Sequence, residues 1–164
     1  MHRDSRVMAT LAPADVPNGG VLPDEETRHF LRRHLDHWDR HGYGLWMFRD
    51  KADDRFVGRA GLHNANAGGN EEVELAYALM AEYWGRGLAT EMAEEIMTIA
   101  FERLHLAEVV CFTLTTNRAS QRVMEKAGFE YERDIVHAGL PHVFYRITAS
   151  GWKERGGNLR STDG

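Results

Sequence analysis

The sequence lacks the features that mark several broad classes of protein. Its 164 residues include a single cysteine, which excludes an internal disulfide framework and fits a reducing compartment. No apolar run approaches the roughly 20 residues of a membrane-spanning helix, and no signal-peptide core follows the first residues. The formal net charge is −5 at pH 7, whereas nucleic-acid-binding proteins usually carry a basic face. We therefore expect a cytoplasmic protein that binds neither a membrane nor a nucleic acid.

Proline is scarce and unevenly distributed, and its distribution suggests where the domain begins. Three of the four prolines (Pro13, Pro17 and Pro23) fall in the first 23 residues, among few apolar positions. Such a composition is typical of a loop. The last ten residues are polar and glycine-rich. We expect an N-terminal loop segment at residues 1–23, one domain at residues 24–154 and a disordered tail at residues 155–164.

Between these ends, the apolar periodicity alternates between helical and strand-like segments. In chain order it predicts a helix from Asp24 to near Gly42, strands at Tyr43–Arg49 and Arg55–Leu62, a Gly/Asn loop at Asn64–Asn70, a strand at Glu72–Leu79, a helix at Leu88–Leu104, a strand at Val109–Leu114, a helix at Asn117–Ala127 that ends at Gly128, and strands at Tyr131–His137 and His142–Thr148. Because most neighbouring strands are joined by hairpins, this order indicates a mixed α/β (α+β) domain with a mostly antiparallel sheet.

The most specific signal is a glycine turn, residues 84–90, between a predicted strand and a predicted helix. Gly85 and Gly87 let the backbone turn tightly just before the helix. The first N–H groups of a helix have no internal partner, and the helix dipole adds partial positive charge there. The turn therefore predicts a binding site for a phosphate or pyrophosphate.

Three phosphate carriers compete for this turn. A nucleoside triphosphate would require Lys and then Ser or Thr after the second glycine, but Leu88 and Ala89 follow Gly87. A dinucleotide would require a third small residue at the position of Thr90, and an acid that ends the next strand, whereas Glu108 begins it. Both are disfavoured. The third carrier, coenzyme A, is implied by a resemblance of the turn to a known family.

Residues 84–89 (WGRGLA) resemble the pyrophosphate-binding motif of the GNAT superfamily of acyl-CoA-dependent N-acyltransferases. Trp84 departs from the usual Gln or Arg, but it is similar to the ribosomal-protein N-terminal acetyltransferase-like (RimJ/RimL-type) branch. Residues 117–129 (NRASQRVMEKAGF) resemble a second motif of that branch, and segments 57–62, 74–79 and 145–148 also fit. The resemblance covers Asp24 to Trp152.

This resemblance implies a GNAT-like fold and direct transfer of an acetyl group from acetyl-CoA to a primary amine, without a metal. It makes residues 24–154 an acyl-CoA N-acyltransferase domain. The residues expected to bind the co-substrate are Tyr77, Ala78, Leu79, Trp84, Gly85, Arg86, Gly87, Leu88, Ala89, Thr90, Asn117 and Ser120. The acceptor amine stays open, because protein N-termini, polyamines, aminoglycosides and small amino compounds are all substrates of this fold.

The expected catalytic residues are Glu74 and Ser120. Glu74 points away from the apolar face of its strand, so it is the first choice for a general base, and Glu72 on the same face is the alternative. Many GNAT proteins protonate the leaving thiolate with a tyrosine, but Met124 stands at that position here. Ser120, one helical turn earlier, could act instead, and Asn117 could contact the pantetheine arm or cap its helix.

The first strand of the family is missing from the pattern, since residues 7–11 resemble the segment that follows it. Either the chain starts late, or another segment or subunit covers the sheet edge, since an exposed edge invites pairing. A second subunit of the same chain in that place would make the protein a homodimer. Together with Met124, the missing strand supports an alternative function, a non-catalytic acyl-CoA-binding module.

Several other residues attract attention without forming a recognisable site. Cys111 lies among apolar residues and is expected to be an inert buried thiol. His34, His37 and His41 recur at helical spacing, but no further ligand pattern accompanies them, so we expect a solvated helix face and no metal. Two further groups could line the acceptor pocket: His142 beside the closing hairpin with His137, and the aromatic residues Trp38, Tyr43 and Trp46.

Overall fold

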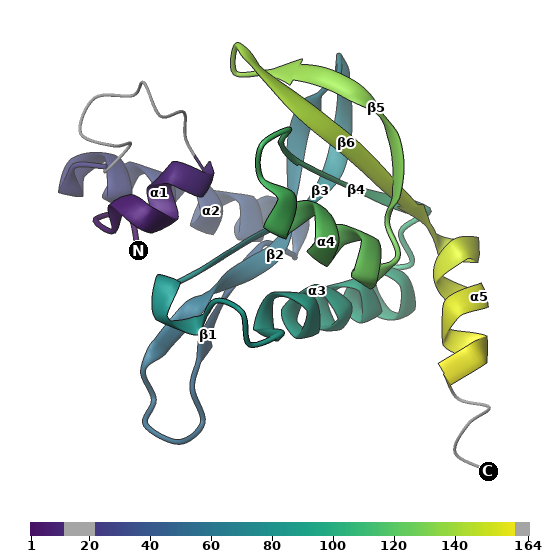
Figure 1. Ribbon diagram of the computed structural model, residues 1–164, viewed down its shortest axis with the longest axis horizontal. Coiled ribbons are helices and arrows are strands. Elements are labelled where there is room, and N and C mark those ends of the chain that lie inside the picture. The colour runs from purple at the N-terminus through teal and green to yellow at the C-terminus, as the bar shows by residue number, and fades with distance from the viewer. Residues whose placement is uncertain (12–21, 160–164) are drawn as a thin grey trace.

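The computed structural model describes residues 1–11 and 22–159 and confirms the mixed α/β fold. Six strands form one sheet in the order β1-β2-β3-β4-β6-β5, and every neighbouring pair is antiparallel except β3 and β4. Helices α3 and α4 pack against each other across one face of the sheet. Helix α2 lies against the other face, where His34 stacks on His63, and α1 lies in front of α2 in the view of Figure 1.

The elements follow the predicted order closely. Their bounds are α1 Ser5–Leu11, α2 Asp24–His41, β1 Leu45–Arg49, β2 Phe56–Ala67, β3 Asn70–Leu79, α3 Leu88–Thr98 with a π-helical continuation at Ile99–Arg103, β4 Glu108–Leu114, α4 Arg118–Ala127, β5 Glu130–His137, β6 Leu140–Thr148 and α5 Ala149–Leu159. Gly42 and Gly128 end α2 and α4 in the left-handed conformation, as predicted.

Three expectations about loops and ends are wrong. The Gly/Asn segment 64–70 is no loop, because β2 and β3 stay paired from Leu79 to Asn70 and turn only at Gly68 and Gly69. Within the expected N-terminal loop, Ser5–Leu11 is helix α1, which buries Val7 and Met8. Within the expected disordered tail, residues 155–159 belong to α5. The remainder of both segments lies outside the described residues.

The face that α2 turns to the sheet differs from the one its apolar residues suggest. Leu31 and Leu35 are exposed, whereas Phe30, His34 and His37 are half-buried. These rings contact partners near the sheet: His34 stacks on His63, and His37 bonds Asn64. A largely polar and aromatic helix face therefore covers this side of β2.

Side-chain alternation along β3 divides its residues between the two faces of the sheet. Leu75 and Leu79 enter the main core beneath α3 and α4. Glu74 lies on the opposite face, opposite His63 of β2. Helix α2 covers this face through His34. A ligand that contacts both α3 or α4 on one face and Glu74 on the other must therefore pass between the strands of the sheet.

The sheet opens between β3 and β4. These parallel strands are paired at one position, Glu74 with Val110, whereas β2 and β3 are paired at ten positions. Beyond Glu74 the two strands diverge, so the backbone of residues 75–79 borders a gap. The gap is the structural feature that positions the site.

Strand β1 forms one edge of the sheet. In the described residues that precede it, 1–11 and 22–44, the structure contains helices and no strand. Pairing of this edge with a second copy stays a prediction. No helix among the described residues combines the length and apolar character needed to cross a membrane.

Candidate active site

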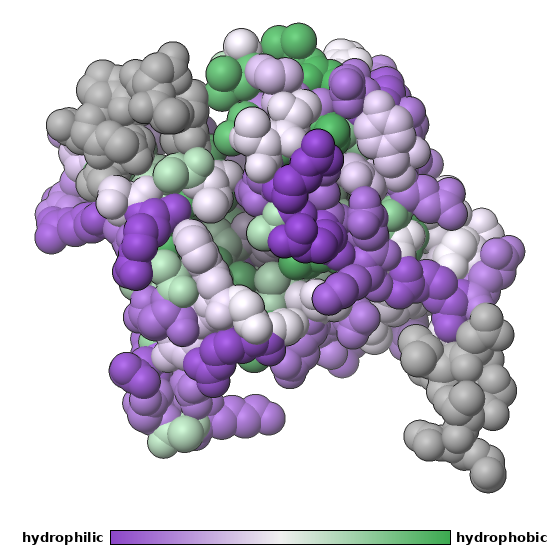
Figure 2. All heavy atoms as spheres, viewed as in Figure 1, coloured by the Kyte–Doolittle hydropathy of each residue, from purple (hydrophilic) through white to green (hydrophobic). Residues whose placement is uncertain are grey.

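A cavity of about 440 Å³ occupies the gap between β3 and β4. Apolar atoms are visible in the recess at the centre of the molecule, between hydrophilic atoms (Figure 2). The lining residues come from α1, β3, the glycine turn, α3, β4 and α4: Thr10, Leu11, residues 74–79, Tyr83, Trp84, Gly85, residues 87–90, residues 111–113, Asn117, Ala119, Ser120, Arg122, Val123 and Lys126. All predicted co-substrate residues except Arg86 lie here, as do Glu74 and Ser120.

The glycine turn enters α3 through two left-handed residues. Gly85 has φ +72° and Gly87 has φ +78°, a region in which a side chain is strained. Gly87 precedes the first residue of α3, and no side chain caps this end of the helix. The carbonyl of Gly87 accepts the N–H groups of Thr90 and Glu91, so the N–H groups before them are left for another acceptor at the cavity.

Trp84 anchors the turn to the end of β3. Its indole Nε1 donates a hydrogen bond to the carbonyl oxygen of Leu79 at 3.1 Å, and the residue is 44% exposed. The unusual residue of the motif thus connects the turn to the strand that borders the gap. Arg86, by contrast, lies over the ring of Tyr83, with its Cζ 5.3 Å from the ring centroid.

Helix α4 faces the turn across the cavity. Asn117 caps it, since its Oδ1 accepts the backbone N–H of Ser120 at 3.1 Å. The Ser120 hydroxyl lies 2.6 Å from the phenol oxygen of Tyr77 on β3, and burial raises the pKa of that phenol above its ordinary value. Met124, at the position of the family tyrosine, is 1% exposed and belongs to the core.

Glu74 is the only carboxylate among the described residues that line the cavity, and it is 9% exposed. Burial raises its pKa to about 8. Its Oε2 lies 2.7 Å from Nε2 of His63. The pKa of His63 is lowered to about 4, mainly by burial and to a smaller extent by the nearby His37, Arg33 and Arg59. Near neutral pH a largely uncharged carboxyl and a neutral imidazole therefore share this hydrogen bond.

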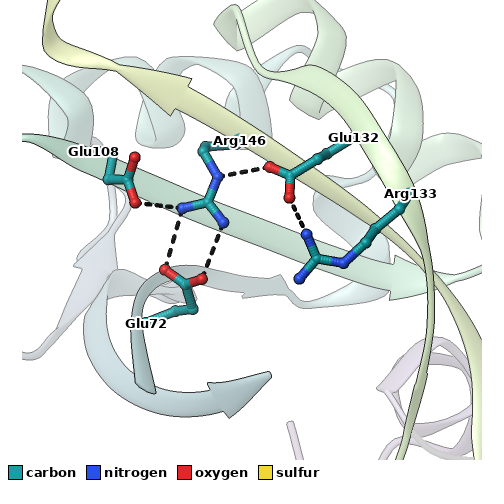
Figure 3. A network of polar contacts seen from close by, with 5 residues as sticks. All are labelled: Glu72, Glu108, Glu132, Arg133 and Arg146. Carbon is teal, nitrogen blue, oxygen red and sulfur yellow. Dashed lines mark hydrogen bonds and ion pairs between the residues drawn. The ribbon is translucent and has the colours of Figure 1, made fainter. Parts of the chain in front are cut away.

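Glu72, the alternative base, lies outside the cavity and belongs to an ionic network (Figure 3). Arg146 of β6 contacts Glu72 through both oxygens, at 2.9 and 3.2 Å. The same guanidinium bonds Glu108 of β4 at 2.5 Å and Glu132 of β5 at 2.6 Å. Hydrogen bonds to these carboxylates raise the pKa of Arg146. The network ties four strands together and holds Glu72 away from the gap.

The other side chains considered from the sequence lie outside the reactive centre or carry no charge there. Cys111 lines the cavity as a buried thiol whose pKa burial raises. His37 bonds the Tyr43 carbonyl and Asn64. His137 and His142 pack against the ring of Phe112 and are not among the lining residues. In the described part of the chain, no group of three or more His, Cys, Asp or Glu could hold a metal ion.

Trp38 and Trp46 contact each other edge to face, with 4.7 Å between their ring centroids. Trp38 also donates to the carbonyl of Leu45, and Trp46 packs on the main core. The Tyr43 hydroxyl donates to Asn64. None of the three is among the residues that line the cavity.

A comparison with known protein families identifies the family of the chain. The model of the "Acetyltransferase (GNAT) domain" matches residues 1–130. The chain belongs to the GNAT acetyltransferase family. Members of this family use acetyl-CoA as co-substrate, and the mostly antiparallel six-stranded sheet with its helices agrees with solved GNAT structures.

Individual relatives agree with the family. The chain is 34% identical to the FsC-acetyl coenzyme A-N(2)-transacetylase of Aspergillus fumigatus over 125 residues, 68% of this chain and 52% of that protein. It is 31% identical to the putative ribosomal N-acetyltransferase YdaF of Bacillus subtilis over 107 residues, 62% of this chain and 58% of that protein. The chain therefore spans little more than half the length of these relatives. A putative GNAT-family acetyltransferase from Bordetella pertussis has a similar fold, with TM-score 0.74 and 22% identity over 82% of this chain and 83% of that one.

Three features of the site escaped the sequence analysis. His63 follows the predicted strand Arg55–Leu62, and only its register opposite Glu74 identifies it. Tyr77 was expected to bind the co-substrate, but its bond to Ser120 depends on how α4 docks. The closure of the cavity by Thr10 and Leu11 had no signal either, because that segment was expected to be loop.

Proposed function

We propose that this protein transfers the acetyl group of acetyl-CoA to a primary amine by direct attack of the amine within a ternary complex. The observation that carries the proposal is the cavity itself, which joins the free N–H groups at the start of α3 to the buried carboxyl of Glu74. One end offers donors for an anion, and the other offers a proton acceptor, within a single opening through the sheet.

The residues present suit coenzyme A. The pyrophosphate would lie on the N–H groups of the glycine turn, where the dipole of α3 favours negative charge. Arg122 and Lys126 of α4 line the same cavity and add positive charge. The phenol oxygen of Tyr83 is buried and has no hydrogen-bond partner among the described residues. Because Tyr83 lines the cavity, its hydroxyl could form a hydrogen bond with a polar group of the bound ligand.

Glu74 would act as the general base. An amine attacks only in its neutral form, and an α-amino group with a pKa near 8 is about one-tenth neutral at pH 7, whereas a lysine-like amine is far less so. A base is most effective when its pKa lies near the working pH. The pKa of Glu74, raised to about 8, meets this condition.

Backbone alternation selects the donor for the carbonyl oxygen of the thioester. The Met80 N–H bonds the Val57 carbonyl on β2, and groups along an antiparallel strand alternate in direction. Ala78 then directs its N–H to β2, whereas Tyr77 and Leu79 direct theirs to the gap. We assign the Tyr77 N–H to the developing oxyanion, because the adjacent Leu79 lies at the end held by Trp84.

Ser120 would donate a hydrogen bond to the departing thiolate and keep its own proton. The Tyr77 hydroxyl lies 3.1 Å from the Ser120 carbonyl oxygen and 2.6 Å from Ser120 Oγ, and when it donates to Oγ the hydrogen of Ser120 is free to point into the cavity. The donor need not be strong, because a thiol with a pKa of about 8.5 leaves tolerably as thiolate. This pair would supply from β3 and α4 what Met124 cannot.

The finer assignment is to the RimJ/RimL-type branch, acting in the cytoplasm. The WGRGLA turn and the similarity to a putative ribosomal N-acetyltransferase support this branch. The test compares the rate at which the protein acetylates peptides at their N-terminal amine with its rates for spermidine and aminoglycosides at equal concentration. Preference for peptides is expected, and exclusive use of a small amine would contradict the branch.

Calorimetric titration with acetyl-CoA, followed by thiol release over a panel of amines, tests the reaction. Binding and amine-dependent release are expected, and absence of binding would refute the proposal. The second candidate, a non-catalytic acyl-CoA-binding module, is favoured by Met124 in the core. It would be supported if acetyl-CoA binds and no amine accelerates thiol release.

A further inference from the structure

Glu74 has a single polar partner among the described residues. His63 occupies Oε2 at 2.7 Å, and no other hydrogen bond to this carboxyl is present there. The second oxygen, Oε1, is therefore left for an acceptor amine or a water that relays its proton. His63 lies directly opposite Glu74 in the β2–β3 register, so strand pairing itself brings the two side chains together.

The imidazole of His63 is fixed by helix α2. It stacks on His34, with 5.7 Å between ring centroids and 7° between ring planes. His34 packs on Phe30 at 4.2 Å, and the guanidinium of Arg59 lies 4.1 Å above that ring. This column of rings fixes the plane of the His63 imidazole, because a tilt of the ring would lose the stack on His34. The hydrogen bond to Glu74 then selects the ring edge that carries Nε2.

We propose that His63 is a positioning residue for the general base: its neutral imidazole donates the Nε2 hydrogen to Oε2 of the Glu74 carboxylate and thereby holds Oε1 toward the acceptor. The inference rests on the proposed function of Glu74. The hydrogen bond stabilises the charged form of a carboxylate that burial alone would keep protonated. His63 itself neither touches the amine nor changes its number of protons during the reaction.

Burial, reinforced by nearby charges, explains why His63 stays neutral. Burial has the largest effect on its pKa, and His37 and Arg33 on α2 and Arg59 on its own strand further disfavour an imidazolium. His34 beside it is itself kept neutral, mainly by burial. On the other side, β4 contributes only the Cys111 thiol, which burial keeps protonated. A cationic His63 would form an ion pair and hold Glu74 ionised well below neutral pH, where it would be a poorer base. A neutral donor stabilises the carboxylate less.

The test measures the titration of Glu74 in two ways, in wild type, His63→Phe and His63→Gln. Phenylalanine keeps the stack on His34 and removes the donor, whereas glutamine retains an N–H donor. We expect the apparent pKa in the kcat profile to rise by about one unit in His63→Phe, which lowers the rate about tenfold at pH 7.5. In His63→Gln the profile returns toward that of wild type, and acetyl-CoA affinity is unchanged in both variants.

Carboxyl ¹³C NMR of glutamate-labelled protein, assigned by the signal lost in Glu74→Gln, gives the same pKa without turnover. It separates the two claims: if wild type acetylates no amine, the proposed function fails, yet the NMR titration still shows whether His63 acts on Glu74. His29→Phe, an exposed substitution on α2, is the matched control and should change neither measurement. An unchanged pKa of Glu74 in His63→Phe would overturn the proposal. A parallel, pH-independent loss of rate would instead indicate a merely structural role.

Discussion

Glu72 and Glu74 lie two residues apart on one face of β3, but their surroundings differ in kind. Glu72 accepts two hydrogen bonds from Arg146, which also holds Glu108 and Glu132. Glu74 is buried beside a neutral histidine at the point where β3 and β4 begin to diverge. Arg146 binds one glutamate in an ionic network, whereas burial raises the pKa of its neighbour to about 8, so that this second group gains and loses a proton near that pH. The same residue type thus serves the architecture at one position of the strand and, we propose, the chemistry two residues later.

The largest effect is expected from exchanging each carboxylate for an amide of the same shape. Glu74→Gln should lower kcat at pH 7.5 about 100-fold or more, since a positioned base contributes about 10²–10⁴ in rate. Glu72→Gln should lower it less than threefold, because Glu72 lies outside the cavity. Steady-state assays of thiol release measure both. Equal losses of kcat in the two variants would contradict the claim that Glu74, and not Glu72, takes part in the reaction.

Removing the centre of the ionic network tests the architectural half of the comparison. Arg146→Leu leaves three carboxylates facing one another and should reduce the free energy of unfolding by about 2 kcal/mol, between the values typical of exposed and of buried ion pairs, because the network is partly exposed. Urea denaturation measures this loss. The rate per folded molecule should remain within twofold, and a selective loss of activity would link the network to the reaction.

The two carboxylates should also differ in how pH affects stability. Between about pH 4.5 and 8, folded protein holds a proton on Glu74 that the unfolded chain releases, so the free energy of unfolding falls as pH rises through this window. Glu74→Gln removes this dependence. From pH 6 to pH 9 the variant should lose about 2 kcal/mol less than wild type, by denaturation at each pH. Identical slopes would mean that Glu74 is ionised throughout.

The smallest effect is expected within the network itself. Glu132→Gln removes one of three carboxylates around Arg146, and Glu72 and Glu108 remain bound. We expect a loss of less than about 1 kcal/mol, which is typical of partly exposed pairs. Thermal unfolding with Arg146→Leu as reference measures it. A loss as large as that of Arg146→Leu would show that Glu132 is indispensable and the network not redundant.

The sequence predicted the features that depend on local chemistry. The glycine turn needs two residues at positive φ before a helix, and Gly85 and Gly87 can be recognised from the local sequence because glycine adopts positive φ readily. Gly128 ends its helix for the same reason. The alternation in β3 placed Glu72 and Glu74 on one face, but it could not separate them, because Arg146 comes from a strand more than 70 residues later.

What depends on distant packing escaped prediction. The composition of residues 64–70 indicates a loop, yet Asn64 is held in the strand by His37 and Tyr43. The importance of His63 arises from its register opposite Glu74, which no local pattern encodes. The opening between β3 and β4 follows from the single paired position of two parallel strands, a property of the whole sheet.

The most direct test of the account is the pH dependence of kcat for wild type and Glu74→Gln with the same saturating amine, from pH 6 to pH 10. For wild type the account predicts a rate that rises with pH and levels off above about pH 8, where Glu74 is ionised. For Glu74→Gln it predicts a lower rate that follows only the neutral fraction of the amine, so the loss relative to wild type is far greater at neutral pH than at high pH. Superimposable profiles, differing by neither shape nor height, would contradict the central claim that Glu74 is the base.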